Sequence, residues 1–132
     1  MINPRLCLTH SAVLVVVFIL FGCAAGSSII TGTVRSAISQ DEVKIYIEPP
    51  SQYETIGIVE AASDVEFSRQ AAQDRVIHEL KAQAAKIGAN GIILVNTGTG
   101  RRDSGYYSNN VFYASSATVI NGQGKAIYVI EK

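Results

Sequence analysis

Hydrophobic residues form one long run near the start of the chain and shorter, patterned groups after it. Every residue from Ala12 to Phe21 is apolar. Residues 29–34 are β-branched and contain a glycine, a composition that predicts a strand at a sheet edge. Val43 to Glu48 alternates between apolar and polar residues, which is the pattern of a half-buried strand. Residues 54–62 predict a further strand, where Gly57 indicates a bulge or the close approach of another element.

One segment has the period of an amphipathic helix. Ser63 followed three residues later by Glu66 predicts its N-terminal cap. Gly88 predicts its end, because glycine readily adopts the left-handed conformation that follows a helix. At 100° per residue, the apolar side chains form one stripe that we expect to cover a sheet. The stripe consists of Ala72, Val76, Ile77, Leu80, Ala84 and Ile87.

The other side of this helix has two interpretations. It carries His78 among Ala71, Ala82, Ala85 and Phe67. The alanines are explained by helix propensity, since alanine is the best helix former. They are also explained by a second packing face, for a partner or for another copy of the chain.

The chain after the helix predicts three strands and two connections. Residues 92–95 are four consecutive apolar residues, typical of a strand buried on both faces. A strand, a helix and a strand in succession imply a right-handed parallel crossover. Residues 97–110 are polar and predict a long loop, and a strand over 111–120 follows. Residues 121–124, Asn-Gly-Gln-Gly, predict a hairpin turn into a last strand over 126–130.

These elements predict an α+β fold in which one amphipathic helix packs on a mostly antiparallel sheet. The predicted order is β-β-β-α-β-β-β, and the first strand is the weakest of the set. One domain of this size has a workable but modest core.

The apolar run at the start has the layout of a secretory signal peptide. Arg5 precedes the run, and Leu20-Phe21-Gly22-Cys23 resembles the lipobox of bacterial lipoproteins. That resemblance implies that the Cys23 thiol is acylated and that the membrane is a partner through this lipid. Each buried methylene contributes about 0.8 kcal/mol, so several acyl chains anchor a protein firmly. The predicted organisation is a signal peptide over 1–22, a short tether over 23–28 and a domain over 29–132.

Two other interpretations of the run stay open. A transmembrane anchor needs about 20 apolar residues, and the stretch from Ala12 to Ala25 is shorter and contains a glycine. The run also fits an ordinary cleaved signal, in which case Cys23 is incidental.

Charge and composition exclude several function classes. Lys and Arg number 11 and Asp and Glu also number 11, so no basic surface for nucleic acid is expected. The domain contains no cysteine beyond Cys23, and its one histidine is His78. We therefore expect no zinc or copper site and no cofactor.

Two candidate chemical motifs lack the context that they need. Residues 98–102, Gly-Thr-Gly-Arg-Arg, resemble a phosphate loop, but such a loop must open a helix, and the polar residues that follow do not predict one. Asp74 precedes His78 by one helical turn, yet no Gly-x-Ser-x-Gly nucleophile motif accompanies this pair. We therefore expect no catalytic residues and no enzyme.

The predicted loop is the best candidate for contact with a partner. Arg101 and Arg102 lie near Tyr106 and Tyr107, and arginine and exposed aromatic residues are favoured at interfaces. The outward helix face around His78 is the second candidate.

Three segments resemble a known group. Residues 56–60, 84–94 and 122–127 are similar to segments of RcsF-like outer-membrane lipoproteins and of the wider YbjQ-like fold. The resemblance implies a compact sheet packed on one helix and tethered to a membrane. In such lipoproteins, a residue other than aspartate after the lipidated cysteine goes with export to the outer membrane. Ala24 follows Cys23, so the resemblance implies that the protein lies on the periplasmic face of the outer membrane.

The chain also departs from that group. RcsF-like proteins carry two disulfides in the domain and a long proline-rich tether, and this chain has neither. We expect a non-enzymatic envelope sensor, adaptor or assembly factor that works through contacts with an envelope protein. The alternative is a YbjQ-like module that forms homo-oligomers or binds a small ligand.

Overall fold

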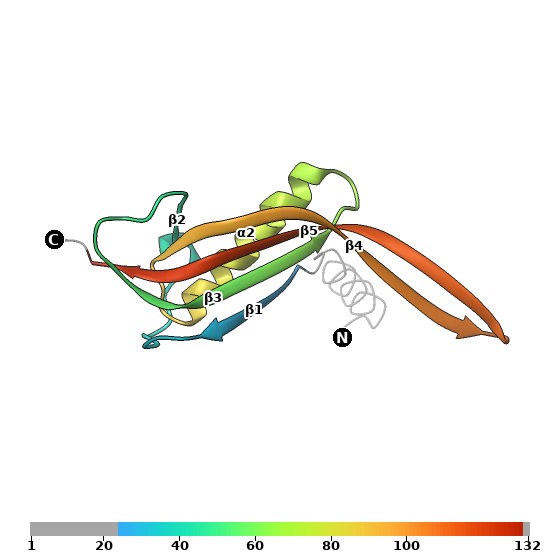
Figure 1. Ribbon diagram of the computed structural model, residues 1–132, viewed down its shortest axis with the longest axis horizontal. Coiled ribbons are helices and arrows are strands. Elements are labelled where there is room, and N and C mark those ends of the chain that lie inside the picture. The colour runs from blue at the N-terminus through green and yellow to red at the C-terminus, as the bar shows by residue number, and fades with distance from the viewer. Residues whose placement is uncertain (1–23, 131–132) are drawn as a thin grey trace, which may run out of the picture.

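The computed structural model describes residues 24–130 (Figure 1). The predicted signal peptide and Cys23 lie outside these residues. Within them, no helix combines the length and the apolar character that crossing a membrane requires. The elements are β1 (Ala25–Ile30), the short 3-10 helix η1 (Gln40–Glu42), β2 (Lys44–Tyr46), β3 (Tyr53–Asp64), α2 (Arg69–Lys86), β4 (Gly91–Ser108) and β5 (Val111–Val129).

The five strands form one mixed sheet with the order β1-β3-β5-β4-β2. β2 pairs with β4 in parallel, and the other neighbouring strands are antiparallel. α2 lies across one face of this sheet (Figure 1). Since β5 is antiparallel to both β3 and β4, those two strands run in the same direction and α2 connects them. The α+β class, the helix on a mostly antiparallel sheet and the parallel crossover are confirmed.

The predicted order of elements is wrong after the helix, because residues 121–124 do not form a turn. They lie inside β5, which continues without a break from 111 to 129. A Cβ atom added at Gly122 would stand 2.5 Å from Val76 Cγ1, and one added at Gly124 would overlap Ile92. The two glycines therefore let neighbouring side chains pack closely against the strand.

The predicted loop over 97–110 is also wrong. β4 extends to Ser108, and the chain turns at Asn109 and Asn110. Both have positive φ values, 48° and 63°, as a two-residue hairpin turn that fits the twist of the strands requires. Beyond the β3 partner at Val119, β4 and β5 pair only with each other in the described sheet. We call residues 101–118 the ribbon.

The N-cap of α2 lies five residues after the predicted cap, Ser63. It is Ser68, whose side chain accepts a hydrogen bond from the backbone N–H of Ala71. Ser63 is instead a buried residue of β3, and its hydroxyl accepts a 2.8 Å hydrogen bond from Arg75 Nε. Gly88 has a φ of 75° and follows the helix as predicted. The predicted stripe is confirmed, with Ile77 half-buried and its other members buried.

The second packing face of α2 is partly covered by the chain itself. Residues 35–42, here called the strap, cross this side of the helix, and the backbone N–H of Ile38 donates to the carbonyl of Ala85 at 3.1 Å. Ala85 is only 4% exposed and belongs to the core. Ala71 and Ala82 are half-buried, whereas Phe67 is 92% exposed. The interpretation of this side as an open face for a partner or another copy is therefore wrong at Ala85.

Two of the strand predictions need adjustment, and the prediction at Gly57 is confirmed. β1 covers Ala25–Ile30 rather than the predicted 29–34, so it starts inside the expected tether, and its position at the sheet edge is confirmed. Gly57 shows both predicted features, because the register shifts between Thr55 and Gly57 and the carbonyl of Ile29 lies against it. Burial on both faces fails at Val95, which is 61% exposed at a second register shift.

Candidate functional site

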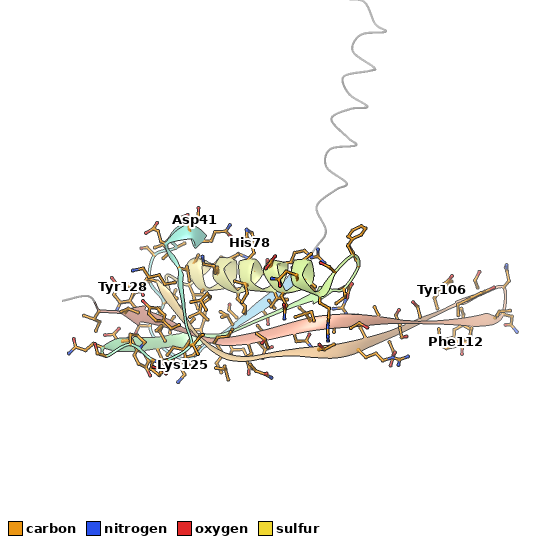
Figure 2. The ribbon with its side chains drawn as sticks, turned by 90° about the horizontal axis from the view of Figure 1, so that it is seen from above. Asp41, His78, Tyr106, Phe112, Lys125 and Tyr128 are labelled. Atoms are coloured by element: carbon orange, nitrogen blue, oxygen red, sulfur yellow. The ribbon has the colours of Figure 1, made fainter. Side chains whose placement is uncertain are left out.

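The ribbon projects beyond the rest of the molecule as a two-stranded arm (Figures 1 and 2). Its strands continue β4 and β5, so the sheet itself sets the direction of the arm. The β4 half of the ribbon, residues 101–108, is about 26 Å long at the usual rise per residue of a strand. The helix and the other three strands lie at the opposite end (Figure 1).

Cross-strand aromatic pairs stabilise the end of the ribbon. We call this end, residues 106–113, the tip. Tyr106 stacks on Tyr113 with ring centroids 5.3 Å apart and planes 16° from parallel. Tyr107 meets Phe112 at 5.0 Å with an angle of 49°. Such pairs contribute about 0.5–1.5 kcal/mol beyond the burial of area. Because neighbouring residues of a strand point to opposite faces, one pair lies on each face of the ribbon.

These aromatic residues remain largely open to solvent despite their pairing. Val111 beside the turn is exposed as well. The exposed fractions are 64% for Tyr106, 78% for Tyr107, 51% for Val111, 55% for Phe112 and 48% for Tyr113. Exposed apolar side chains that gather on a surface are a common feature of interaction sites.

Arg101 and Arg102 lie where the ribbon leaves the sheet, which we call its root. Each of them forms an ion pair. Arg101 Nε is 3.0 Å from Asp103 Oδ1. Arg102 Nη1 is 3.0 Å from Asp64 Oδ1, which ties the root to the end of β3. From Ser104 to Thr118 no residue carries a charge. The tip is therefore aromatic, polar and uncharged.

The sequence-predicted contact residues do not form one patch. By the alternation of strand side chains, Arg102 and Tyr106 share one face, and Arg101 and Tyr107 share the other. The predicted set also lacked the β5 half of the tip, Val111 to Tyr113. The apolar run Val-Phe-Tyr at the start of the expected strand was the available signal, but its place opposite Tyr106 and Tyr107 required the register.

His78 belongs to a different part of the molecule. It lies on the exposed side of α2 near η1 of the strap, as the labels of His78 and Asp41 in Figure 2 show. Its Nε2 atom is 2.7 Å from Gln40 Nε2. Asp74 accepts a 2.9 Å hydrogen bond from Gln70 rather than orienting His78. His78 therefore helps to hold the strap and is separate from the ribbon.

Two observations bear on sites for a metal or a small ligand. Within residues 24–130, no three His, Cys, Asp or Glu side chains gather as a metal site would require. An open hollow of about 470 Å³ lies where β1, β3, β4 and β5 approach the root of the ribbon. One of its polar pairs is already bonded internally, since Gln123 Nε2 donates to Glu60 Oε1 at 2.6 Å.

Comparisons with known proteins yield one distant match. No family model matches the chain, and no curated protein matches its sequence. Among solved structures, the Francisella virulence factor FvfA in its orthorhombic crystal form is similar, with 17% sequence identity and a TM-score of 0.47. The match covers 76% of this chain and 97% of that chain. A similarity of this size transfers no property of that protein to this chain, so the likeness to RcsF-like and YbjQ-like lipoproteins stays a prediction.

Proposed function

We propose that this protein is a lipid-anchored envelope adaptor without enzymatic activity, and that its ribbon docks on a partner protein. One observation carries the proposal. The ribbon projects from the sheet and ends in an uncharged tip with exposed aromatic pairs on both faces.

The composition of the tip and of the residues beside it supports a protein partner. Residues 104–116 consist mainly of tyrosine, serine, glycine and asparagine. Tyrosine supplies a large rigid contact area at low cost in conformational entropy, and the small polar residues adapt their hydrogen bonds to a partner. The asparagines of the turn offer further hydrogen bonds at the extreme end.

The two-sided arrangement specifies the shape of the partner surface. A flat surface on one side would cover the Tyr106–Tyr113 pair and leave Tyr107 and Phe112 in water, or the reverse. A cleft that admits the whole tip covers both pairs. A two-stranded hairpin is marginally stable when nothing packs on it. Docking into a cleft would therefore also order the ribbon.

The anchor supports a location at the membrane. A lipid on Cys23 would lie two residues before β1, so the domain would be held close to the bilayer. By the resemblance given above, this is the periplasmic face of the bacterial outer membrane. Labelling of the full-length chain with a palmitate analogue tests the anchor. Incorporation that is lost in Cys23→Ala supports it, and equal labelling of that variant contradicts it.

The docking proposal is tested by photocrosslinking in cells. A photoreactive amino acid replaces Tyr107 in one variant and the exposed Ser51, in the connection between β2 and β3, in a matched control. We expect the Tyr107 position to capture one envelope protein that the Ser51 position does not capture. The same products from both positions, or products with lipid alone, would contradict the proposal.

A second set of variants separates the tip from its root. Replacing Tyr106, Tyr107, Phe112 and Tyr113 together by alanine is expected to abolish capture of the partner by crosslinkers placed elsewhere on the domain. Replacing Arg101 and Arg102 by alanine is expected to weaken capture less, because both charges already have partners within the chain. The reverse ranking would place the contact at the root of the ribbon.

A further inference from the structure

The two edges of the sheet differ in how they are protected from pairing with other strands. The β2 edge is short, with three residues, carries Lys44 and is soon followed by Pro49 and Pro50. Short length, lysine and proline are the devices by which edge strands avoid further pairing. β1, at the other edge, has six residues, all exposed, and contains no charge and no proline.

β1 also exposes its two largest side chains. Ile29 is 56% exposed and Ile30 is 54% exposed. Because neighbouring side chains of a strand point to opposite faces, one isoleucine lies on each face of the sheet. In an antiparallel pair, alternate residues direct their N–H and C=O groups away from the partner strand. The outer side of β1 therefore offers a template for one more strand.

We propose that the occupant of this edge is β1 of a second copy of the chain, paired antiparallel about a two-fold axis. The two five-stranded sheets would then continue into each other, with both α2 helices on the same face. Such an interface uses the same surface on both copies, as most homodimers do. The proposal uses β1 alone and does not rest on docking by the ribbon.

The sequence of β1 is complementary to itself in this arrangement. In an antiparallel pair, two residues directly opposite each other point to the same face of the sheet. The two-fold axis therefore passes through a residue rather than between two residues. The two residues at the centre of β1 are Ser27 and Ser28. With the axis at Ser28, Gly26 lies opposite Ile30 of the second copy and Ser27 opposite Ile29. With the axis at Ser27, Ala25 lies opposite Ile29. In both registers, each isoleucine that has a residue of the second copy opposite it lies across from a small residue. β1 contains no charged residue, so no like charges come together.

This pairing has a consequence for the ribbons. Ala25 of β1 pairs with Ala62 of β3, close to the end of the sheet from which the ribbon projects. An antiparallel β1 pair therefore directs the two ribbons toward opposite ends of the dimer. The dimer is a two-armed body with its joint at the β1 edge.

The test uses single cysteines in the full-length chain. Ser27→Cys and Ser28→Cys place a thiol at each possible axis, where opposite Cα atoms in an antiparallel pair are about 4.5–5.5 Å apart, within the range for a disulfide. Ser51→Cys is the matched control, and the parent chain gives the background of its own Cys7 and Cys23. Membranes from expressing cells are treated with a mild oxidant. We expect a disulfide-linked dimer from Ser27→Cys or Ser28→Cys that exceeds the control at least tenfold.

A second substitution shows whether the dimer depends on strand pairing. Ile29→Lys adds a charge to the edge at an exposed position, and is expected to lower the crosslinked fraction several-fold while the protein accumulates normally. Equal crosslinking from Ser51→Cys, crosslinks to a different protein, or monomer from both β1 variants would each overturn the proposal. A β1 crosslink that Ile29→Lys leaves unchanged would also overturn it.

Discussion

Gly122 and Gly98 provide a matched test of close packing between a strand and the helix. A Cβ atom at Gly122 would meet Val76 at 2.5 Å and Leu80 at 3.1 Å, whereas one at Gly98 would have nothing within 4 Å. Overpacking of a core costs typically 1–3 kcal/mol. We expect Gly122→Ala to lower the free energy of unfolding by about that amount, measured by urea unfolding. Gly98→Ala should leave it unchanged or raise it by less than about 1 kcal/mol.

Equal stability of the two variants would contradict this explanation. It would mean that α2 shifts away from β5 at no cost, and that the glycine is not needed for the packing of the helix.

Arg35 joins the strap to the sheet, and its geometry predicts that lysine cannot replace it. Its guanidinium lies 3.9 Å from the centre of the Tyr128 ring and its Nη2 atom is 2.5 Å from Glu54 Oε2. A cation–π contact at an exposed site contributes about 0.5–1 kcal/mol. We expect Arg35→Lys to lower stability by about that amount in thermal unfolding, because lysine has no planar group to stack on the ring.

Arg69→Lys serves as the control for Arg35. That side chain is exposed, and its Nη2 atom donates a 2.6 Å hydrogen bond to Thr99 Oγ1. A similar loss in both variants would show that stacking on Tyr128 adds nothing.

At the scale of elements, the ribbon and the sheet should differ in local stability. The ribbon strands pair only with each other and their side chains are exposed, whereas Ile92 and Ala126 are fully buried at the other end of the same strands. Local opening is easiest where buried apolar contacts are few. We expect amides of residues 103–116 to exchange with deuterium at least about 100-fold faster than those of residues 91–94 and 124–127.

Mass spectrometry of the exchanging chain measures this directly. Equal protection in the two regions would contradict the view that the free ribbon is only marginally stable. Slowing of exchange in the ribbon alone, after a partner is added, would locate the docking site.

The elements that were predicted correctly are those whose side chains are sorted by burial. The helix stripe repeats with the period of an α-helix, so it is visible in the sequence. The alternation over residues 43–48 locates β2, although β2 covers only Lys44–Tyr46 and Ile47 is 85% exposed. The ribbon has no buried face, and its polar composition therefore indicates a loop. Asn121-Gly122 has the composition of a hairpin turn. In the structure Gly122 lies within β5, where the absence of a side chain leaves room for Val76 of α2.

Half of the candidate site was predicted from the sequence. Tyr106 and Tyr107 were recognised because they lie near Arg101 and Arg102, and arginine and exposed aromatic residues are favoured at interfaces. Their partners Tyr113 and Phe112 were assigned to a strand, and only the register of β4 against β5 brings the four rings together. The pairing of Arg102 with Asp64 joins residues 38 positions apart and has no local signal.

At the scale of the whole molecule, stability rests on one core under α2. Neither cysteine of the chain lies within residues 24–130, so no disulfide holds the described fold. We expect an excess of dithiothreitol to leave the melting temperature of the purified protein unchanged within about 1 °C, because a loss of even 1 kcal/mol would shift it by several degrees. A clear fall would mean that a disulfide formed by a cysteine outside these residues stabilises the fold.

β5 forms one half of the ribbon and also lies between β3 and β4 in the sheet. A force on the tip therefore acts on an inner strand of the sheet rather than on an edge. Because the hydrogen bonds of an antiparallel ladder lie across the strands, tension along the ribbon would load the β3–β5 ladder in shear, with all its bonds resisting together. The arm would transmit a pull into the core of the domain without unzipping from it.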